Sequence, residues 1–381
     1  MPRKLIGGQR PEGTGNRPGR TRPRRAAAGR WLAGAGAALA VLTVAACTSA
    51  GGTSESGSEP GDAAASPSAA AVSPGAGSSL EQQYERVVSR VLPSVVQIST
   101  SSGSGSGVVY DTRGDIVTNA HVVGSATAVQ VSRASGGKPL SARVVGVFAP
   151  SDLAVIRVAS GAASLHPASF GRSATARVGE IVLAMGNPLG LTGTVTDGIV
   201  SATGRTVSEG EGSSAVLISA IQTSAAINPG NSGGALVNLA GQVIGIPTLA
   251  ATDPQLGGAA AGIGFAIPSD TVTSIARQLI ATGKVTNSGR ASLGITAQTV
   301  ADASGQPAGV GIVSVTPGGA AARAGLQAGD IITGLAGQKI PSVAALQSVL
   351  AAHKPGDQIQ ARIVRDGSES SVQVTLGNLT G

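Results

Sequence analysis

Apolar and polar residues alternate along much of the chain from Leu80 onward, and short turn-forming stretches interrupt the alternation. Glu81–Val91 has the spacing of a short helix, which Pro93 ends because proline cannot continue a helix. The next segments are short, rich in β-branched residues and separated by Gly-rich turns: Ser94–Thr100, Val108–Tyr110, Val129–Ser132, Ala142–Val147 and Leu153–Val158. This pattern predicts an all-β barrel or sandwich.

The later part of this region predicts two further strands and one amphipathic helix. The strands, Ala235–Leu239 and Val243–Ile246, are separated by a short Gly-containing turn. Ser269–Thr282 has its apolar residues on one stripe, with Ser269 or Asp270 as the expected N-cap and Gly283 as the end. The polar, Gly-rich segments 201–214 and 252–261 are predicted to be loops near a functional site.

Residues 1–47 have the features of an export signal. Nine of the 27 Lys and Arg residues lie within residues 1–30, and the apolar run Trp31–Ala46 follows them. The run is short for a membrane span of about 20 residues, and it ends in small residues before Cys47. This ending resembles a bacterial lipobox, after which Cys47 would be lipidated. The alternative is an uncleaved anchor helix in which Cys47 has no role.

Both alternatives place the rest of the chain outside the cytoplasm, at the outer face of the bacterial cytoplasmic membrane. The formal charge of +7 does not indicate a nucleic-acid partner, because residues 1–30 hold nine basic residues and one acidic residue. The remainder is nearly neutral and has no basic face for phosphates. Residues 48–79 are mostly Ser, Gly, Ala and Pro and predict a disordered linker.

The segment Ala226–Leu236 is the strongest chemical signal in the chain. Ser232 lies among Gly230, Gly233 and Gly234, which allow the backbone to approach a reacting group closely. The N–H groups of Gly230 and Ser232 are spaced to point into one hole, where they could stabilise an oxyanion. Ser232 is therefore a candidate nucleophile, although a Gly- and Ser-rich surface turn would have the same composition.

Two upstream residues could complete a catalytic triad. His121 lies at the end of a predicted strand, and Asp152 opens an otherwise apolar strand. Taken singly, the histidine could be a structural residue and the aspartate a turn residue. Together with Ser232 they supply base, orienting acid and nucleophile in the order His, Asp, Ser, which is the order of chymotrypsin-like proteases.

The segments around these residues resemble the catalytic blocks of the HtrA (DegP-like) serine proteases. The resembling segments are Thr118–Val123, Asp152–Val155, Ile227–Gly234, Gly186–Gly190 and Gly262–Pro268. The chain departs from the family pattern at Ala235, where proline is usual, and at Ser224, where aspartate is common. The resemblance implies a chymotrypsin-like double β-barrel over residues 80–283, no cofactor and no metal site.

The resemblance also implies a mechanism and a substrate class. His121 would take the proton of Ser232 as the hydroxyl attacks a peptide carbonyl, and Asp152 would hold the imidazole. Ala225, Ala226 and Ile227 would border the primary specificity pocket, whose apolar lining favours small or aliphatic side chains. Substrates would be unfolded or damaged extracytoplasmic proteins, and a homo-oligomer, commonly a trimer in this family, is expected.

Residues 290–379 resemble a PDZ domain, after a short linker at 284–289. In that family a Leu-Gly-Ile loop captures a C-terminal carboxylate through backbone N–H groups, and the peptide adds a strand. The resemblance assigns this role to Leu293, Gly294 and Ile295. Ser342–His353 is the expected helix, and Gln358–Arg365 and Ser371–Leu376 are expected strands.

The sequence also allows two functions other than an HtrA-like protease. Gly230–Gly234 also fits the Gly-x-Ser-x-Gly turn of an α/β-hydrolase, for which Ser232, Asp330 and His353 have the required order. That turn needs a helix after the serine, and none is predicted. The second alternative is a non-catalytic chaperone or scaffold protein that binds peptides through the PDZ domain.

Overall fold

The computed structural model describes residues 75–188, 193–208, 216–228, 230–253 and 258–381. The predicted export signal, Cys47 and nearly all of the predicted linker lie outside the described residues. The first described element is helix α1, Gly75–Val91, which begins earlier than the pattern predicts. Its apolar residues Tyr84, Val87, Val88 and Val91 recur at helical spacing and pack into a core shared with the barrels that follow.

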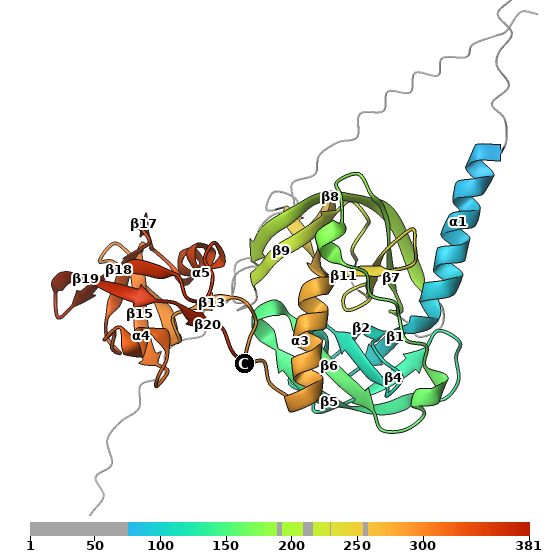
Figure 1. Cartoon of the computed structure of the whole chain (residues 1–381), viewed down its shortest axis with the longest axis horizontal. Helices are drawn as coiled ribbons and strands as arrows, with labels where there is room; N and C mark the ends of the chain where they lie inside the picture. The colour runs from blue at the N-terminus through green and yellow to red at the C-terminus, as the bar shows by residue number, and fades with distance from the viewer. Residues whose placement is uncertain (1–74, 189–192, 209–215, 229, 254–257) are drawn as a thin grey trace, which may run out of the picture. The chain divides into compact units, whose positions relative to one another are not determined.

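Twelve strands form two closed antiparallel barrels (Figure 1). The first barrel has the order β1-β2-β3-β6-β5-β4, and the second β10-β11-β12-β9-β8-β7. The strands of the first are β1 Val95–Ser99, β2 Ser104–Val109, β3 Asp115–Thr118, β4 Ala128–Arg133, β5 Leu140–Phe148 and β6 Leu153–Val158. Those of the second are β7 Ile181–Gly186, β8 Thr194–Ser208, β9 Val216–Thr223, β10 Ala235–Asn238, β11 Val243–Asp253 and β12 Gly258–Pro268. The chain therefore has the predicted strand-dominated, double-barrel architecture.

Each barrel is filled by its own apolar side chains, and a third cluster joins the two. Ile98, Ile116 and Ile156 are fully buried in the first barrel, while Leu236 and Val200 are fully buried in the second. The joining cluster combines residues of both barrels with α1 and with helix α3, Ser269–Thr282, which lies along β5, β6 and β11. Because one continuous core connects the barrels, residues from both can be held rigidly against each other.

Three local predictions were wrong. The N-cap of α3 is Pro268; Ser269 and Asp270 bond instead to the Gly171 carbonyl and to Ser173. His121 lies in a short helix, α2 (Ala120–Val123), after strand β3, and not at a strand end. The segments predicted as loops at 201–214 and 252–261 are partly strand, because β8 continues to Ser208, β11 to Asp253, and β12 begins at Gly258. Residues 209–215 and 254–257 lie outside the described part.

Residues from Ala291 onward form a smaller sheet with its own core. The sheet order is β14-β15-β16-β18-β19, formed by β14 Ile295–Ala301, β15 Pro307–Val315, β16 Ile331–Leu335, β18 Gln358–Arg365 and β19 Ser368–Thr375. The remaining elements are β13 Ala291–Ser292, α4 Ala320–Arg323, β17 Gln338–Lys339, α5 Val343–Ala351 and β20 Gly377–Asn378. Strand β14 is at an edge of the sheet. Among the described helices, none is long and apolar enough to cross a membrane.

Candidate active site

Asp152 is held in an unusual backbone conformation between two elements of the first barrel. It follows a single 3₁₀ turn, Ala149–Ser151, and its φ of 49° lies in the left-handed region. Its carbonyl oxygen accepts the Ala120 N–H at 3.1 Å and the Asn119 side-chain amide at 2.9 Å. Residues other than glycine adopt this backbone conformation at an energetic cost, so the surrounding hydrogen bonds must maintain it. They fix Asp152 against the start of α2.

His121 is bonded twice to the buried carboxylate of Asp152. The backbone N–H of His121 donates to Oδ1 at 2.9 Å, and the ring Nδ1 bonds to Oδ2 at 2.8 Å. The side chain of Asp152 is 2% exposed, whereas that of His121 is 48% exposed. An ionised carboxylate only accepts hydrogen bonds, so Nδ1 carries the proton and the neutral ring keeps Nε2 as an acceptor. The pair therefore presents a base to the cavity.

Ser232 lies in a tight loop before strand β10. Gly230 has a φ of 110° and Gly233 a φ of 79°, conformations for which glycine is suited. The Ser232 hydroxyl donates to the Thr248 carbonyl at 2.9 Å. Within the described part of the chain, neither the Gly230 N–H nor the Ser232 N–H donates a backbone hydrogen bond. The oxyanion role predicted for these two groups remains a prediction.

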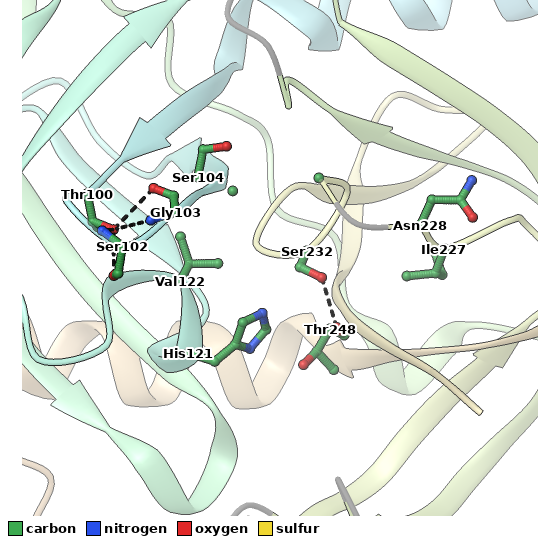
Figure 2. A pocket seen from close by; sticks show the side chains of 12 residues that line it. Thr100, Ser102, Gly103, Ser104, His121, Val122, Ile227, Asn228, Ser232 and Thr248 are labelled. Carbon is green, nitrogen blue, oxygen red and sulfur yellow. Dashed lines mark hydrogen bonds between the residues drawn. The ribbon is translucent and has the colours of Figure 1, made fainter. Parts of the chain in front are cut away.

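His121, Gly230 and Ser232 meet at one cavity of about 480 Å³. Figure 2 shows the His121 ring and the Ser232 side chain near one another in the centre of the view, with Thr248 below the serine. The lining residues come from both barrels: Thr100, Ser102, Gly103, Ser104, Gly105, His121, Val122, Ile227, Asn228, Gly230, Ser232 and Thr248. The described residues contain no cluster of three or more His, Cys, Asp or Glu side chains able to hold a metal ion.

Thr248 is a site residue that the sequence analysis missed. Its hydroxyl donates to Oδ2 of Asp152 at 2.5 Å, and its carbonyl accepts the Ser232 hydroxyl. Thr248 is 4% exposed and lies in strand β11 of the second barrel. A single threonine in a strand carries no local signal for contact with a distant aspartate.

The three residues predicted to border the specificity pocket have different positions. Ile227 lines the cavity, whereas Ala225 is fully buried in the core of the second barrel. Ala226 is exposed, and its carbonyl accepts the Asn231 side-chain amide at 3.1 Å. Ser224 is exposed, and its hydroxyl accepts the Ile199 N–H at 3.0 Å. Ile227 is thus the member of the set that can touch a substrate side chain in the cavity.

Comparison with known proteins gives two family matches. Residues 105–246 match the trypsin-like peptidase domain, and residues 291–376 match the PDZ domain. The chain is 42% identical over 288 residues to "Serine protease Do-like HtrA" of Lactobacillus helveticus, an alignment covering 71% of this chain and 68% of that protein. The chain belongs to the HtrA family of serine proteases.

Other HtrA relatives agree with this assignment. Serine protease PepD of Mycobacterium tuberculosis is 42% identical over 313 residues, which cover 77% of this chain and 66% of that protein. Among solved structures, a serine endoprotease from Yersinia pestis is 36% identical with a TM-score of 0.52, and the match covers 78% of this chain and 98% of that one. The HtrA-type protease AlgW with a decapeptide is 31% identical with a TM-score of 0.53, with the same two coverages. The protein is therefore a serine protease.

The α/β-hydrolase alternative does not fit this HtrA protein. Strand β10, not a helix, follows Ser232. The side chain of Asp330 is 1% exposed and forms a bidentate ion pair with Arg365, whose Nε donates to Oδ1 at 2.6 Å and whose Nη2 donates to Oδ2 at 2.7 Å. The Arg365 hydrogen bonds hold the pKa of Asp330 below its ordinary value. His353 is bonded to Asp357 at 3.2 Å. Each member of the alternative triad thus has a different partner.

The Leu293–Ile295 loop lies at the start of the edge strand β14 in the PDZ domain. Leu293 is buried, with 1% exposure, and its carbonyl accepts the Ala321 N–H at 2.8 Å. Gly294 has a φ of 70°, which turns the chain into β14. A groove beside the loop is also lined by Val343, Leu346 and Leu350 of α5. The unpaired edge, the loop and the apolar groove together suit an extended peptide.

Proposed function

We propose that this HtrA protease cleaves unfolded or damaged polypeptides with His121, Asp152 and Ser232 as its catalytic triad. The observation that carries the proposal is the doubly bonded, buried Asp152 behind a half-exposed His121, in one cavity with Ser232. A base oriented by a buried acid beside a serine in a Gly-rich loop is the arrangement of nucleophilic acyl transfer.

The reaction follows from these contacts. His121 accepts the proton of the Ser232 hydroxyl at Nε2 while Oγ attacks the peptide carbonyl and forms a tetrahedral intermediate. The N–H groups of Gly230 and Ser232 stabilise the oxyanion, and the imidazolium, held by Asp152, then protonates the leaving amine. Water repeats the sequence on the acyl-enzyme. For attack, the hydroxyl that now donates to the Thr248 carbonyl has to present its proton to His121.

The proposal assigns a separate function to each of the two domains. Residues 80–283 form the protease domain, in which Ile227 borders an apolar specificity pocket. Residues 290–379 form the PDZ domain, in which Leu293, Gly294 and Ile295 bind the C-terminal carboxylate of a peptide for regulation or substrate capture. We include a homo-oligomer, by family resemblance a trimer, in this proposal.

The proposed location is the outer face of the cytoplasmic membrane. Its support is the basic and apolar pattern of residues 1–47, which ends at Cys47 as a lipidated cysteine or within an anchor helix. One relative is named a periplasmic pH-dependent serine endoprotease, DegQ of Escherichia coli, at 39% identity over 285 residues that cover 60% of that protein. Residues 48–79 would link the membrane to the folded part.

The test uses the purified full-length chain and its Ser232→Ala variant with fluorescent casein as an unfolded substrate. We expect the wild type to release fluorescence and react with a fluorophosphonate, and the variant to do neither, because the nucleophile is absent. Matching thermal transitions would show that the variant is folded. If neither protein cleaves casein, with or without a PDZ-binding peptide, the proposal is rejected in favour of a non-catalytic chaperone or scaffold protein.

A further inference from the structure

Ser106 connects the first barrel to the loop that carries the nucleophile. It lies in strand β2 and is fully buried, with 0% exposure. Its hydroxyl donates to the Gly230 carbonyl at 2.5 Å and accepts the Asn187 N–H at 2.8 Å. Its backbone N–H donates to the Ser232 carbonyl at 2.9 Å. One residue of the first barrel thus holds both residues whose N–H groups are to bind the oxyanion.

The loop needs such an external restraint at Gly230. Glycine has no Cβ and reaches many backbone conformations with little cost, so its own sterics do not select the φ of 110° found here. The Gly230 carbonyl belongs to the peptide group between Gly230 and Asn231, and the Ser106 hydroxyl restrains the rotation of this group. Pro188 lies on the other side, where a Cβ on Gly230 would approach its Cβ to 2.3 Å.

The surrounding backbone leaves little room for the loop to shift as a whole. A Cβ on Gly186 would lie 2.7 Å from the Gly230 carbonyl oxygen, and a Cβ on Gly233 would lie 2.2 Å from the Ser106 carbonyl oxygen. Close packing therefore limits translation of the loop, whereas rotation of its peptide groups is limited by hydrogen bonds. At Gly230 the hydrogen bond from Ser106 has this role.

We propose that Ser106 is a positioning residue for the oxyanion hole: its hydroxyl fixes the peptide group between Gly230 and Asn231, and its N–H fixes the Ser232 carbonyl, so that the loop keeps the conformation in which Gly230 and Ser232 both line the cavity. Ser106 does not line the cavity; its hydroxyl bonds to Gly230 and Asn187, and its N–H bonds to Ser232. Its effect is on transition-state stabilisation, where the donors must be aimed at the developing charge. The proposal rests on the proposed protease mechanism.

The test compares Ser106→Ala with a matched variant, Ser173→Ala, in the full-length protein. Ser173 is also a mostly buried serine, which donates to Oδ2 of Asp270 at 2.9 Å and accepts the Asp270 N–H at 3.1 Å. Each substitution therefore removes one donated and one accepted hydrogen bond. The measurements are kcat and apparent KM on fluorescent casein, the rate of fluorophosphonate labelling, the pH profile and the thermal midpoint.

For Ser106→Ala we expect kcat and the labelling rate to fall about 10- to 100-fold, with apparent KM within about twofold of wild type. The midpoint of the acid limb of the pH profile stays unchanged, because the His121–Asp152 pair is not altered. For Ser173→Ala we expect the thermal midpoint to fall about as much as in Ser106→Ala, and kcat to stay within about twofold of wild type.

Three results would overturn the proposal. They are a kcat of Ser106→Ala within twofold of wild type, an equal loss in Ser173→Ala, or a displaced acid limb. Ser106→Cys, which keeps a weaker donor, is measured alongside in case the alanine variant does not fold; a kcat equal to wild type in that variant also overturns the proposal. A wild type that fails to react with the fluorophosphonate rejects the protease mechanism itself, which separates the two failures.

Discussion

Thr248 contacts two of the three proposed catalytic residues, and its hydroxyl can be removed without changing its backbone. Thr248→Val keeps the carbonyl that accepts the Ser232 hydroxyl but deletes the 2.5 Å bond to Oδ2 of Asp152. A hydrogen bond to a charged group contributes about 1.5–3 kcal/mol. We therefore expect kcat/KM on casein to fall about 10- to 100-fold, because the carboxylate holds the imidazole less firmly.

The thermal midpoint separates this effect from a general loss of structure. If the midpoint falls by only a few degrees while kcat/KM falls as expected, the hydroxyl acts at the site. If kcat/KM stays within twofold of wild type, the two bonds from His121 suffice to hold Asp152, and Thr248 serves only the fold.

At the scale of single residues, the sequence was informative where a residue's neighbours in the chain carry the signal. Ser232 was predicted as a site residue from the glycines around it, and His121 and Asp152 from the segments Thr118–Val123 and Asp152–Val155. Ser106 and Thr248 were not recognised, since their contacts join positions far apart in the chain: Thr248 and Asp152 are 96 residues apart, and Ser106 and Gly230 are 124 apart. Only the docking of the two barrels creates these pairs.

The serine loop is an element in which the backbone leaves no space for a side chain. At Gly233 a Cβ would lie 2.2 Å from the Ser106 carbonyl oxygen and 2.5 Å from the Thr118 hydroxyl. Gly233→Ala therefore has to displace the loop, and we expect the rate of fluorophosphonate labelling to fall at least about 100-fold, since a shift of about 1 Å has that effect. The measurement is the second-order labelling rate of the full-length variant.

Gly204→Ala is the control for backbone strain in this comparison. Gly204 has a φ of 74°, close to the 79° of Gly233, but no atom lies within 4 Å of the position that a Cβ would take. The two variants share the cost of a left-handed alanine, but only Gly233→Ala adds a clash, and only Gly233 lies beside Ser232. If Gly204→Ala loses as much labelling rate as Gly233→Ala, strain and not loop displacement explains the loss.

At the scale of elements, the fold class was confirmed, and most strands of the first barrel were located from short β-branched segments between Gly-rich turns. The misplaced elements have tertiary causes. The local Gly and Ser content of residues 201–208 is typical of a loop, but pairing with β9 makes them strand. Likewise, helix α2 forms after β3 because the Ala120 N–H donates to the Asp152 carbonyl, a contact that no local pattern reveals.

At the scale of the whole molecule, the chain joins a protease domain, whose cavity contains His121 and Ser232, to a PDZ domain in which β14 is an edge strand. The two have separate cores, so each can keep its own recognition site. Backbone N–H groups at Leu293–Ile295 are expected to bind a carboxylate, and the groove lined by Leu346 and Leu350 is apolar. These features call for a ligand that ends in apolar residues and has a free C-terminus.

This expectation is tested with one peptide in two chemical forms. A fluorescent decapeptide ending in two apolar residues is titrated with the full-length Ser232→Ala protein, which prevents cleavage, and anisotropy is recorded. We expect the free acid to bind at least about 10-fold more tightly than the same peptide with a C-terminal amide, because charge-assisted bonds to a carboxylate are about twice as strong as neutral ones. The apolar contacts are the same in both forms, so they cannot produce the difference. Equal affinities would mean that binding occurs through the catalytic cavity or the apolar groove alone, and the carboxylate role of Leu293, Gly294 and Ile295 would be rejected.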